Sequence, residues 1–141
     1  MFDRILVAID GSKNSYDGLK VAIDVAKKFN SELYLVSDVN TADLPVNIGV
    51  SYEPGLVDDL AIDMKKDLQK GEKIVANANL TYHVQLLNGE PRSELINFSK
   101  DNEIDLIVMG RAGRHSIEKM FIGSVTRYVS EHSQTKVLVV D

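Results

Sequence analysis

The sequence predicts an α/β protein with a single domain, in which helices cover both faces of an open parallel sheet of five strands. Short apolar runs alternate along the chain with segments whose apolar residues recur at helical spacing. The runs at residues 5–9 and 104–109 hold at most one polar residue each, which is typical of parallel strands buried on both faces. A chain of 141 residues is long enough for one hydrophobic core and too short for two domains with a sizeable core each.

The first half of the chain predicts two strands and two helices. Residues 5–9 form the first strand, and Ser12 follows as the N-cap of a helix whose apolar residues return at helical spacing. Residues 33–36 supply a second buried strand. Residues 40–54 hold two prolines and a glycine without a clear period, so we expect a surface loop. From residue 56 to 68 the apolar residues step by four, which predicts a long second helix.

The second half predicts three strands and two helices. Residues 80–86 alternate between apolar and polar side chains, as expected of a strand at the edge of a sheet. Pro91 opens a third helix through residue 99, because proline suits the first helical position. A fourth strand at 104–109, a fourth helix at 125–132 and a last strand at 137–140 complete the pattern. Right-handed crossovers then bring the carboxyl ends of the first, second and fourth strands to one crevice, where a ligand is expected.

A series of glycines follows the fourth strand. Gly110, Gly113 and Gly123 are spaced along this stretch, and Ser124 comes directly after the last of them. Such a turn suits phosphates, because missing side chains let backbone N–H groups approach the oxygens, and a helix beginning at Ser124 adds its positive dipole end. Nucleotide binding is the resulting hypothesis, although Gly110 could simply end a strand and Gly123 simply precede a helix. The basic residues between the glycines suit an anion or a solvated loop: Arg111, Arg114, His115 and Lys119.

Composition excludes several classes of function. The chain has no cysteine, which excludes disulfides and thiolate chemistry. A net charge of -5 argues against the broad basic face that binding to DNA or RNA requires. No apolar stretch approaches the length that spans a membrane, and the start of the chain lacks the pattern of a secretory signal, so the cytoplasm is the expected location.

Some residues also have simpler interpretations. Asp10 could serve only in the turn before the first helix, and Ser124 only as a helix cap. The His115-Ser116 and His132-Ser133 pairs do not indicate a hydrolase, because sequence neighbours point apart whereas a triad needs a base held against its nucleophile. No cluster of His, Asp and Glu has the spacing of a dedicated metal site, so Mg²⁺ is expected only with bound phosphates.

Three segments carry a resemblance to a known family. They are residues 5–12 (ILVAIDGS), 89–91 (GEP) and 105–110 (DLIVMG). With the glycine series, they resemble the universal stress protein family over essentially the whole chain. The most specific element is the pattern G-x2-G-x9-G-S/T, which the glycines and Ser124 meet without a gap. Family members that keep this pattern bind ATP, so the resemblance implies the ATP-binding type.

The resemblance also implies an architecture and a site. The implied sheet order is 3-2-1-4-5, with a homodimer paired through the apolar last strand from Val137 to Val140 and an adenosine pocket at the crevice. Asp10 matches an aspartate beside adenine and ribose. Asp38 departs from the pattern, because the family usually has an apolar residue against adenine there, and a buried carboxylate weakens binding unless it is paired or protonated. With Arg114 added from the basic loop, the expected ATP contacts are Ala8, Ile9, Asp10, Asp38, Met109, Gly110, Gly113, Arg114, Gly123, Ser124, Val125 and Thr126.

Three classes of function follow. The first is an ATP-binding stress protein acting as a nucleotide-dependent switch or chaperone-like regulator, with at most slow hydrolysis because no catalytic base for water is evident. The second is a structural or interaction dimer whose pocket is empty or holds another adenine nucleotide. The third, a phosphoryl-accepting receiver domain, is disfavoured because receivers carry an aspartate at the end of the third strand, where this chain has Leu87-Asn88.

Overall fold

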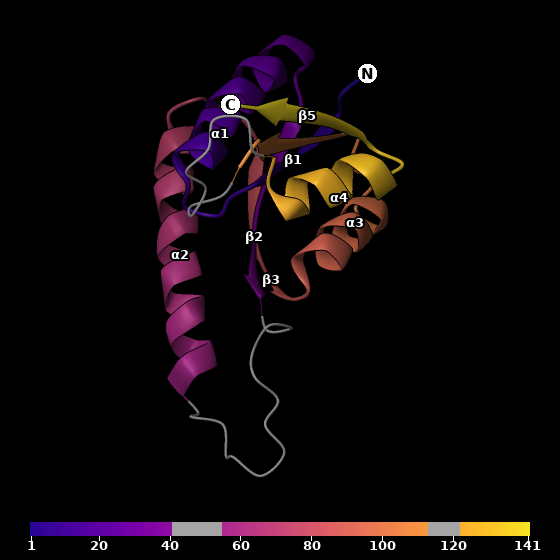
Figure 1. Ribbon diagram of the computed structural model, residues 1–141. Coiled ribbons are helices and arrows are strands. Elements are labelled where there is room, and N and C mark those ends of the chain that lie inside the picture. Colours follow the sequence, from indigo (N-terminus) through magenta and orange to yellow (C-terminus); the bar gives the residue numbers. More distant parts are fainter. Residues whose placement is uncertain (41–54, 113–121) are drawn as a thin grey trace.

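Five strands and four helices alternate along the chain. The computed structural model describes residues 1–40, 55–112 and 122–141, except for the side chains of residues 55–58 (Figure 1). In chain order the elements are β1 (Arg4–Ala8), α1 (Lys13–Phe29), β2 (Glu32–Asn40), α2 (Gly55–Ala76), β3 (Tyr82–Gly89), α3 (Pro91–Asp101), β4 (Leu106–Gly110), α4 (Ser124–His132) and β5 (Lys136–Val140).

The strands form one parallel sheet in the order β3-β2-β1-β4-β5, which confirms the order 3-2-1-4-5. β1 lies at the centre, where Val7 pairs with Leu35 of β2 on one side and with Val108 of β4 on the other. Because β1 runs between two strands and beneath helices on both faces, its central residues Ile5, Leu6 and Val7 have no exposed surface. The uninterrupted apolar run in the sequence is the consequence of this position.

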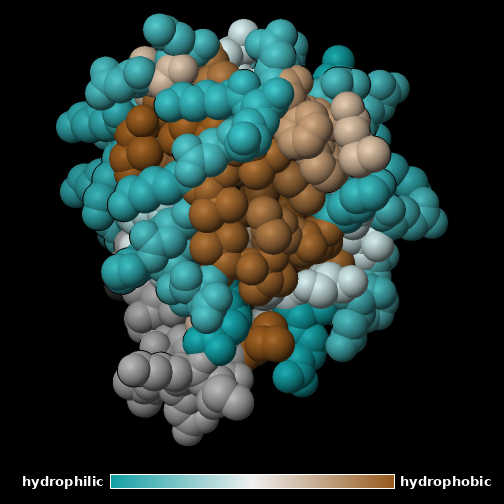
Figure 2. Space-filling model, turned by 90° about the horizontal axis from the view of Figure 1, so that it is seen from above, coloured by the Kyte–Doolittle hydropathy of each residue, from teal (hydrophilic) through white to brown (hydrophobic). Residues whose placement is uncertain are grey.

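The two edges of the sheet differ in character. β3 forms one edge, and its outward residues include the polar side chains of His83 and Gln85. β5 forms the other edge with only apolar residues after Lys136, and Val139 keeps 38% of its surface exposed. Figure 2 shows hydrophobic side chains gathered on the upper face of the molecule, the side on which β5 lies in Figure 1.

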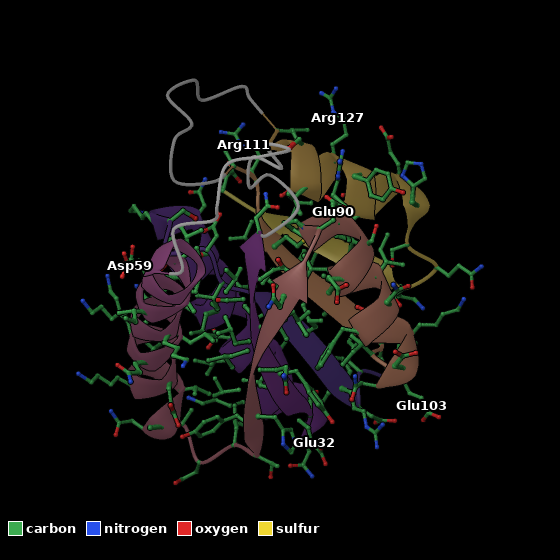
Figure 3. The ribbon with its side chains drawn as sticks, turned by 90° about the horizontal axis from the view of Figure 1, so that it is seen from below. Glu32, Asp59, Glu90, Glu103, Arg111 and Arg127 are labelled. Carbon is green, nitrogen blue, oxygen red and sulfur yellow. The ribbon has the colours of Figure 1, made fainter. Side chains whose placement is uncertain are left out.

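Alternate residues of the central strands point into two separate cores. Helices α1 and α2 cover the face that carries Ile5, Val7 and Leu35, and α3 and α4 cover the face that carries Leu6 and Val36. Figure 3, seen from below, shows α2 on one side of the sheet and α3 with α4 on the other. The molecule is therefore a three-layer α/β fold with helices on both faces, as the sequence predicts.

The structure corrects several boundaries of the strands, and the largest change is at the end of β2. β2 continues to Asn40, four residues beyond its predicted end, and β3 begins at Tyr82 instead of residue 80. The extension brings Asp38 into the ladder, opposite Leu87 of β3. The residues predicted as a surface loop after Asn40, up to residue 54, lie outside the described residues.

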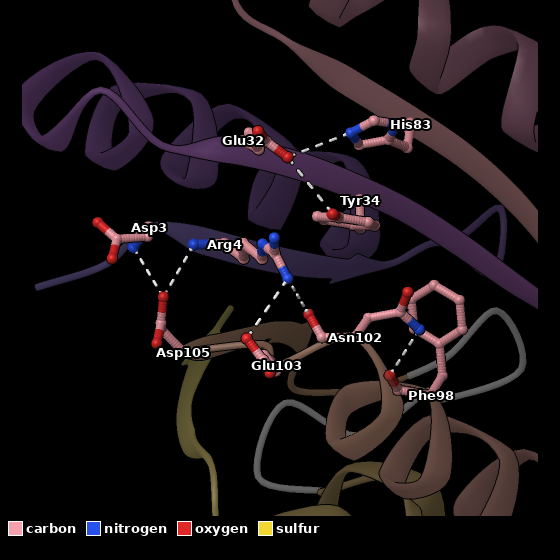
Figure 4. Close-up of polar contacts among 9 residues, drawn as sticks. All are labelled: Asp3, Arg4, Glu32, Tyr34, His83, Phe98, Asn102, Glu103 and Asp105. Atoms are coloured by element: carbon pink, nitrogen blue, oxygen red, sulfur yellow. Dashed lines mark hydrogen bonds and ion pairs between the residues drawn. The ribbon is translucent and has the colours of Figure 1, made fainter.

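Polar contacts fix the amino-terminal end of β1 against the turn before β4 (Figure 4). The Oδ2 atom of Asp105 accepts hydrogen bonds from the backbone N–H groups of Asp3 at 2.8 Å and Arg4 at 2.9 Å. The Nη1 atom of Arg4 donates to the carbonyl oxygen of Asn102 at 3.0 Å and lies 3.8 Å from the carboxylate of Glu103. These contacts hold β1 and β4 in register at the end of the sheet away from the crevice.

The opposite end of β4 packs directly on the start of α1. A Cβ atom at Gly110 would lie 2.8 Å from the Cβ of Asn14 and 2.9 Å from its backbone carbon. A Cβ at Gly18, one turn further along α1, would have its nearest neighbour at 3.5 Å, the Cγ1 atom of Val108. Gly110 is thus needed for the close approach of two backbones, whereas Gly18 has room for a methyl group.

We expect Gly110→Ala to lower the free energy of unfolding by about 1–3 kcal/mol, because backbone atoms must move to admit the methyl group. Gly18→Ala should raise it by about 0.5–1 kcal/mol, because alanine favours the helix and the space is free. Urea titration followed by circular dichroism measures both. Equal changes in the two variants would contradict the steric role of Gly110.

Candidate functional site

A cavity of about 390 Å³ lies at the carboxyl ends of the central strands. It is the crevice that parallel topology predicts, because α1 and α4, the helices that follow the neighbouring strands β1 and β4, lie on opposite faces of the sheet. Six predicted residues line it from the strand ends: Ala8, Ile9, Asp10, Asp38, Met109 and Gly110. Four more line it from the beginning of α4: Gly123, Ser124, Val125 and Thr126.

Two predicted residues, Gly113 and Arg114, lie outside the described residues. The cavity also has walls that the sequence analysis did not assign to the site, and these are Ser15, Val36, Ser37, Met64, Pro91 and Leu95. Several of these residues belong to apolar faces, so their sequence pattern is the same as that of core residues. They differ from core residues only by lying at the ends of strands and helices, and the sequence does not fix these ends closely.

Backbone hydrogen bonds join the two ends of the connection between β4 and α4. The N–H of Gly123 donates to the carbonyl oxygen of Arg111 at 2.8 Å, and the N–H of Arg111 donates to that of Val140 at 2.8 Å. The glycine series therefore begins and ends at one place on the cavity rim. This supports the assignment of Gly110 and Gly123 to one site, although 12 residues separate them in the sequence.

The beginning of α4 faces the cavity without a side-chain cap. Gly123 is its N-cap residue, no side chain accepts from the first turn, and this turn holds no acidic residue. The hydroxyl of Thr126 donates to the carbonyl oxygen of Gly110 at 2.8 Å, which ties the helix to the end of β4. Ser124 is the first helical residue and not the cap, so that simpler interpretation of Ser124 is wrong. N–H groups of an uncapped first turn and the helix dipole favour an anion here.

Asp10 has the turn role that the sequence left open. Its Oδ1 atom accepts the N–H of Ser12 at 2.9 Å, and the hydroxyl of Ser12 accepts the N–H of Ser15 at 3.1 Å as the N-cap of α1. Asp10 is exposed and also lines the cavity. The turn thus fixes the position of a carboxylate at the cavity mouth.

Asp38 is the least satisfied side chain of the site. Both carboxyl oxygens are shielded from solvent, and neither has a hydrogen-bond partner among the described residues. Loss of water and the negative charges of Glu94 and Glu90 raise the pKa of Asp38 from 3.8 to about 7. The N–H of Gly89 offsets part of this rise but does not reach hydrogen-bond geometry. Asp38 is therefore divided between neutral and ionised forms near neutral pH.

Glu90, which neighbours Asp38, is held in its ionised form. Partial loss of water raises its pKa, but the Arg92 guanidinium and the N–H groups of Ser93 and Arg92 outweigh this and lower the pKa of Glu90 to about 2. The carboxylate accepts the Nε–H of Arg92 at 2.7 Å and the N–H of Ser93 at 3.0 Å, and so caps α3. A permanent negative charge therefore stands beside Asp38.

In the part of the chain that the structure describes, the remaining polar candidates do not come together as a catalytic group. His132 is exposed and stacks on Tyr128, with ring centroids 4.0 Å apart. His83 is exposed on the edge strand, 3.3 Å from the carboxylate of Glu32. Within the described residues, no three His, Asp or Glu side chains gather as a metal site, and none of the helices is long and apolar enough to cross a bilayer. His115, Ser116 and Lys119 lie outside the described residues.

Comparisons with known proteins agree with this geometry. The model of the universal stress protein family matches residues 1–141. Universal stress protein YxiE of Bacillus subtilis is 33% identical and covers 99% of both chains. Universal stress protein MJ0531 of Methanocaldococcus jannaschii is 30% identical over 99% of this chain and 82% of its own length.

Solved structures confirm the fold. Universal stress protein UspA from Lactobacillus plantarum superposes with a TM-score of 0.83 at 24% identity, over 99% of this chain and 98% of its own. A universal stress protein in complex with cAMP gives a TM-score of 0.72 at 23% identity, over 99% and 96% of the two chains. One from Archaeoglobus fulgidus in complex with dAMP gives 0.74 at 19% identity, over 100% and 98%.

The raised pKa of Asp38 predicts a pH-dependent loss of stability. Because this pKa is higher in the folded chain than the ordinary value of 3.8, the folded chain binds the proton more tightly, and its stability falls as pH rises from about 4 through about 7. The free energy of unfolding of Asp38→Asn should therefore increase relative to that of the wild type as pH rises. We expect about 2 kcal/mol, roughly half of what the full shift converts to, because the side chain is only half-buried.

Urea unfolding at about pH 4 and about pH 8 measures this difference between variant and wild type. Asp24→Asn, at an exposed position on α1, is the matched control and should show no such trend. A difference between Asp38→Asn and wild type that stays constant with pH would contradict the burial of an unpaired acid.

Proposed function

Since this chain belongs to the universal stress protein family, we propose that it binds ATP in the cavity at the carboxyl ends of β1, β2 and β4. In this proposal it acts as a nucleotide-dependent switch or chaperone-like stress factor. Mg²⁺ enters with the phosphates, whose oxygens are the ligands that this ion prefers. The triphosphate lies at the beginning of α4, and the nucleoside lies toward β2 and α3.

One observation carries this proposal. A single cavity has an uncapped helix N-terminus at one end and apolar side chains of Val36, Met64 and Leu95 at the other. The first feature favours phosphate and the second favours a purine ring. The family relatives in complex with cAMP and dAMP support an adenine nucleotide as the class of ligand.

Efficient hydrolysis is not part of the proposal. Fast ATPases orient the attacking water with a dedicated side chain. Among the described lining residues, the acids are Asp10, which is engaged in the turn, and Asp38, at the nucleoside end. We therefore propose binding with at most slow turnover.

The cAMP and dAMP complexes of the family also favour a second candidate function. In it, the protein is an interaction dimer that holds an adenine nucleotide other than ATP. The ligand released when the purified protein is denatured distinguishes the two. Recovered ATP supports the first function, and recovered adenosine monophosphates support the second.

We also propose a homodimer through the edge strand β5. Its residues Val137 to Val140 leave an apolar ribbon whose outer backbone groups face no further strand in the described chain. Exposed flat edges of this kind associate unless they are blunted, and Lys136 stands only at the beginning of the strand. Antiparallel pairing with a second copy satisfies these backbone groups and buries Val139 in a symmetric interface.

Variants at the two ends of the cavity test the orientation of the nucleotide. Asp10→Asn keeps an oxygen for the Ser12 N–H but loses the charge, so ATP, AMP and adenosine should each bind roughly 10-fold or more weakly. Ser124→Ala should weaken ATP about 3- to 10-fold and leave adenosine unchanged, because its proposed contact is to phosphate. Isothermal titration calorimetry of the wild type and both variants with each ligand measures these affinities.

The matched control for Asp10→Asn is Asp24→Asn, which is remote from the cavity and should bind all three ligands as the wild type does. Equal losses for ATP and adenosine in Ser124→Ala would show that the orientation is reversed. Wild-type protein that binds none of the three ligands would refute the proposed function.

Val139→Lys should convert the dimer to a monomer, because a charge would be buried at the centre of the proposed interface. Val84→Lys is the matched control, since Val84 is also 38% exposed but lies on the opposite edge strand β3. Sedimentation velocity at low micromolar concentration measures the state of each. A wild-type chain that sediments as a monomer would exclude the β5 dimer as the stable form.

A further inference from the structure

The Asp38 carboxyl lies at the nucleoside end of the cavity. Asp38 follows Val36 on the same face of β2, and both residues line the cavity together with Leu95 of α3. The phosphate end, marked by Ser124, is formed by β4 and α4 on the other side of β1. A nucleotide placed as proposed therefore brings its base, and not its phosphates, to Asp38.

Within the described chain, this carboxyl has no hydrogen bond to lose. Neither oxygen has a partner among the described residues, and both are shielded from solvent. A base reaches them after the side chain turns toward the cavity that Asp38 lines, and this turn breaks no existing hydrogen bond. Buried polar groups in native proteins nearly always have partners, so an acid left without one at a ligand cavity indicates that the ligand supplies it.

The two forms of a carboxyl group match different purines. A neutral acid presents a carbonyl acceptor beside an O–H donor, which complements the N6 amino group and N1 acceptor of adenine. A carboxylate presents two acceptors, which complement the N1–H and N2 amino donors of guanine. A carboxyl group in the wrong form for the hydrogen-bonding edge of the base leaves buried polar atoms unpaired. Such mismatches discriminate strongly between ligands.

We propose that Asp38 selects the base of the bound nucleotide by pairing with its hydrogen-bonding edge, the neutral acid accepting adenine and the carboxylate accepting guanine. This rests on the proposed function, because it takes the nucleotide and its orientation from there. It goes further by making the occupant of the site depend on a single proton.

The charges around Asp38 set where this proton is lost. From α3, Glu90 and Glu94 oppose ionisation, and the Arg92 guanidinium is directed to Glu90. From β3, the Gly89 N–H favours it. The loop after β1 contributes Asp10, the other charged residue among the described cavity walls, while α2 contributes the uncharged Met64 and α4 uncharged residues. With the pKa of Asp38 at about 7, the two forms exchange dominance within the physiological range.

The ratio of ATP to GTP affinity is the decisive measurement. Between about pH 6 and about pH 8 the fraction of neutral Asp38 falls roughly 10-fold, so ATP should weaken about 10-fold while GTP tightens about 10-fold. The ratio should therefore change about 100-fold. ATP and GTP carry the same triphosphate, so titration of the phosphates and of residues near them cancels in this ratio. Calorimetric titration of the full chain with each Mg²⁺ nucleotide at both pH values provides it.

Two variants of Asp38 isolate the side chain. Asp38→Asn fixes one acceptor beside one donor, so it should favour ATP at both pH values with a constant ratio. Asp38→Val removes the edge contact, so it should bring the ratio toward one and abolish its pH dependence. Asp24→Asn, on the surface of α1, should keep the wild-type trend. Circular dichroism establishes that each variant is folded.

The possible outcomes separate the inference from the function on which it rests. ATP binding with a ratio that does not change with pH, or with the same pH dependence in Asp38→Asn, overturns the role of Asp38 and leaves the proposed function standing. Wild-type protein that binds neither nucleotide at either pH overturns both. A wild-type ratio that falls with pH and becomes constant in Asp38→Asn supports the inference.

Discussion

The central position of β1 is the constraint on which the rest of this structure depends. β1 pairs with β2 on one side and with β4 on the other, so its residues are covered in every direction and must be apolar. Helix α1, which follows β1, lies on one face of the sheet, while α4, which follows β4, lies on the other. The cavity lies between these two helices at the carboxyl ends of the strands. The same strand order that builds the core therefore places the candidate site.

Close backbone packing at this end gives the first glycine of the series a role separate from any ligand. The end of β4 lies so near the first turn of α1 that a Cβ atom at Gly110 would meet Asn14 at 2.8 Å. In α2, a Cβ at Gly71 would lie 3.3 Å from the Cδ2 atom of Leu35, a milder contact because a side-chain methyl can shift. A glycine in a phosphate-binding pattern can thus be required by the protein backbone itself. Stability and the proposed binding can therefore both involve Gly110, and only separate measurements of the two distinguish them.

Much of the fold could be predicted from the sequence, because buried strands and amphipathic helices have plain periodic patterns. Prediction failed at the end of β2, where Ser37 and Asp38 interrupt the apolar run although the strand continues to Asn40. Ser37 is buried because its hydroxyl donates to the carbonyl oxygen of Ile9 at 2.5 Å, a contact that periodicity does not reveal. Ten of the predicted site residues line the cavity, but Met64 and Leu95 read as core because cavity walls and core share one apolar face. The pattern is ambiguous where a strand or helix reaches the cavity.

Two neighbouring acids at this end of the cavity reach opposite states for the same electrostatic reason. Glu90 caps α3, where N–H groups and the Arg92 guanidinium compensate its charge, so it remains ionised. That fixed charge, with that of Glu94, opposes ionisation of Asp38, for which the described chain offers no compensating cation. The capping of α3 thus stabilises the carboxylate of Glu90. The charge of Glu90 in turn helps to keep Asp38 on β2 near the midpoint of its titration at neutral pH. A side chain in that position responds to whatever group is brought against it, and in a cavity that group belongs to the ligand.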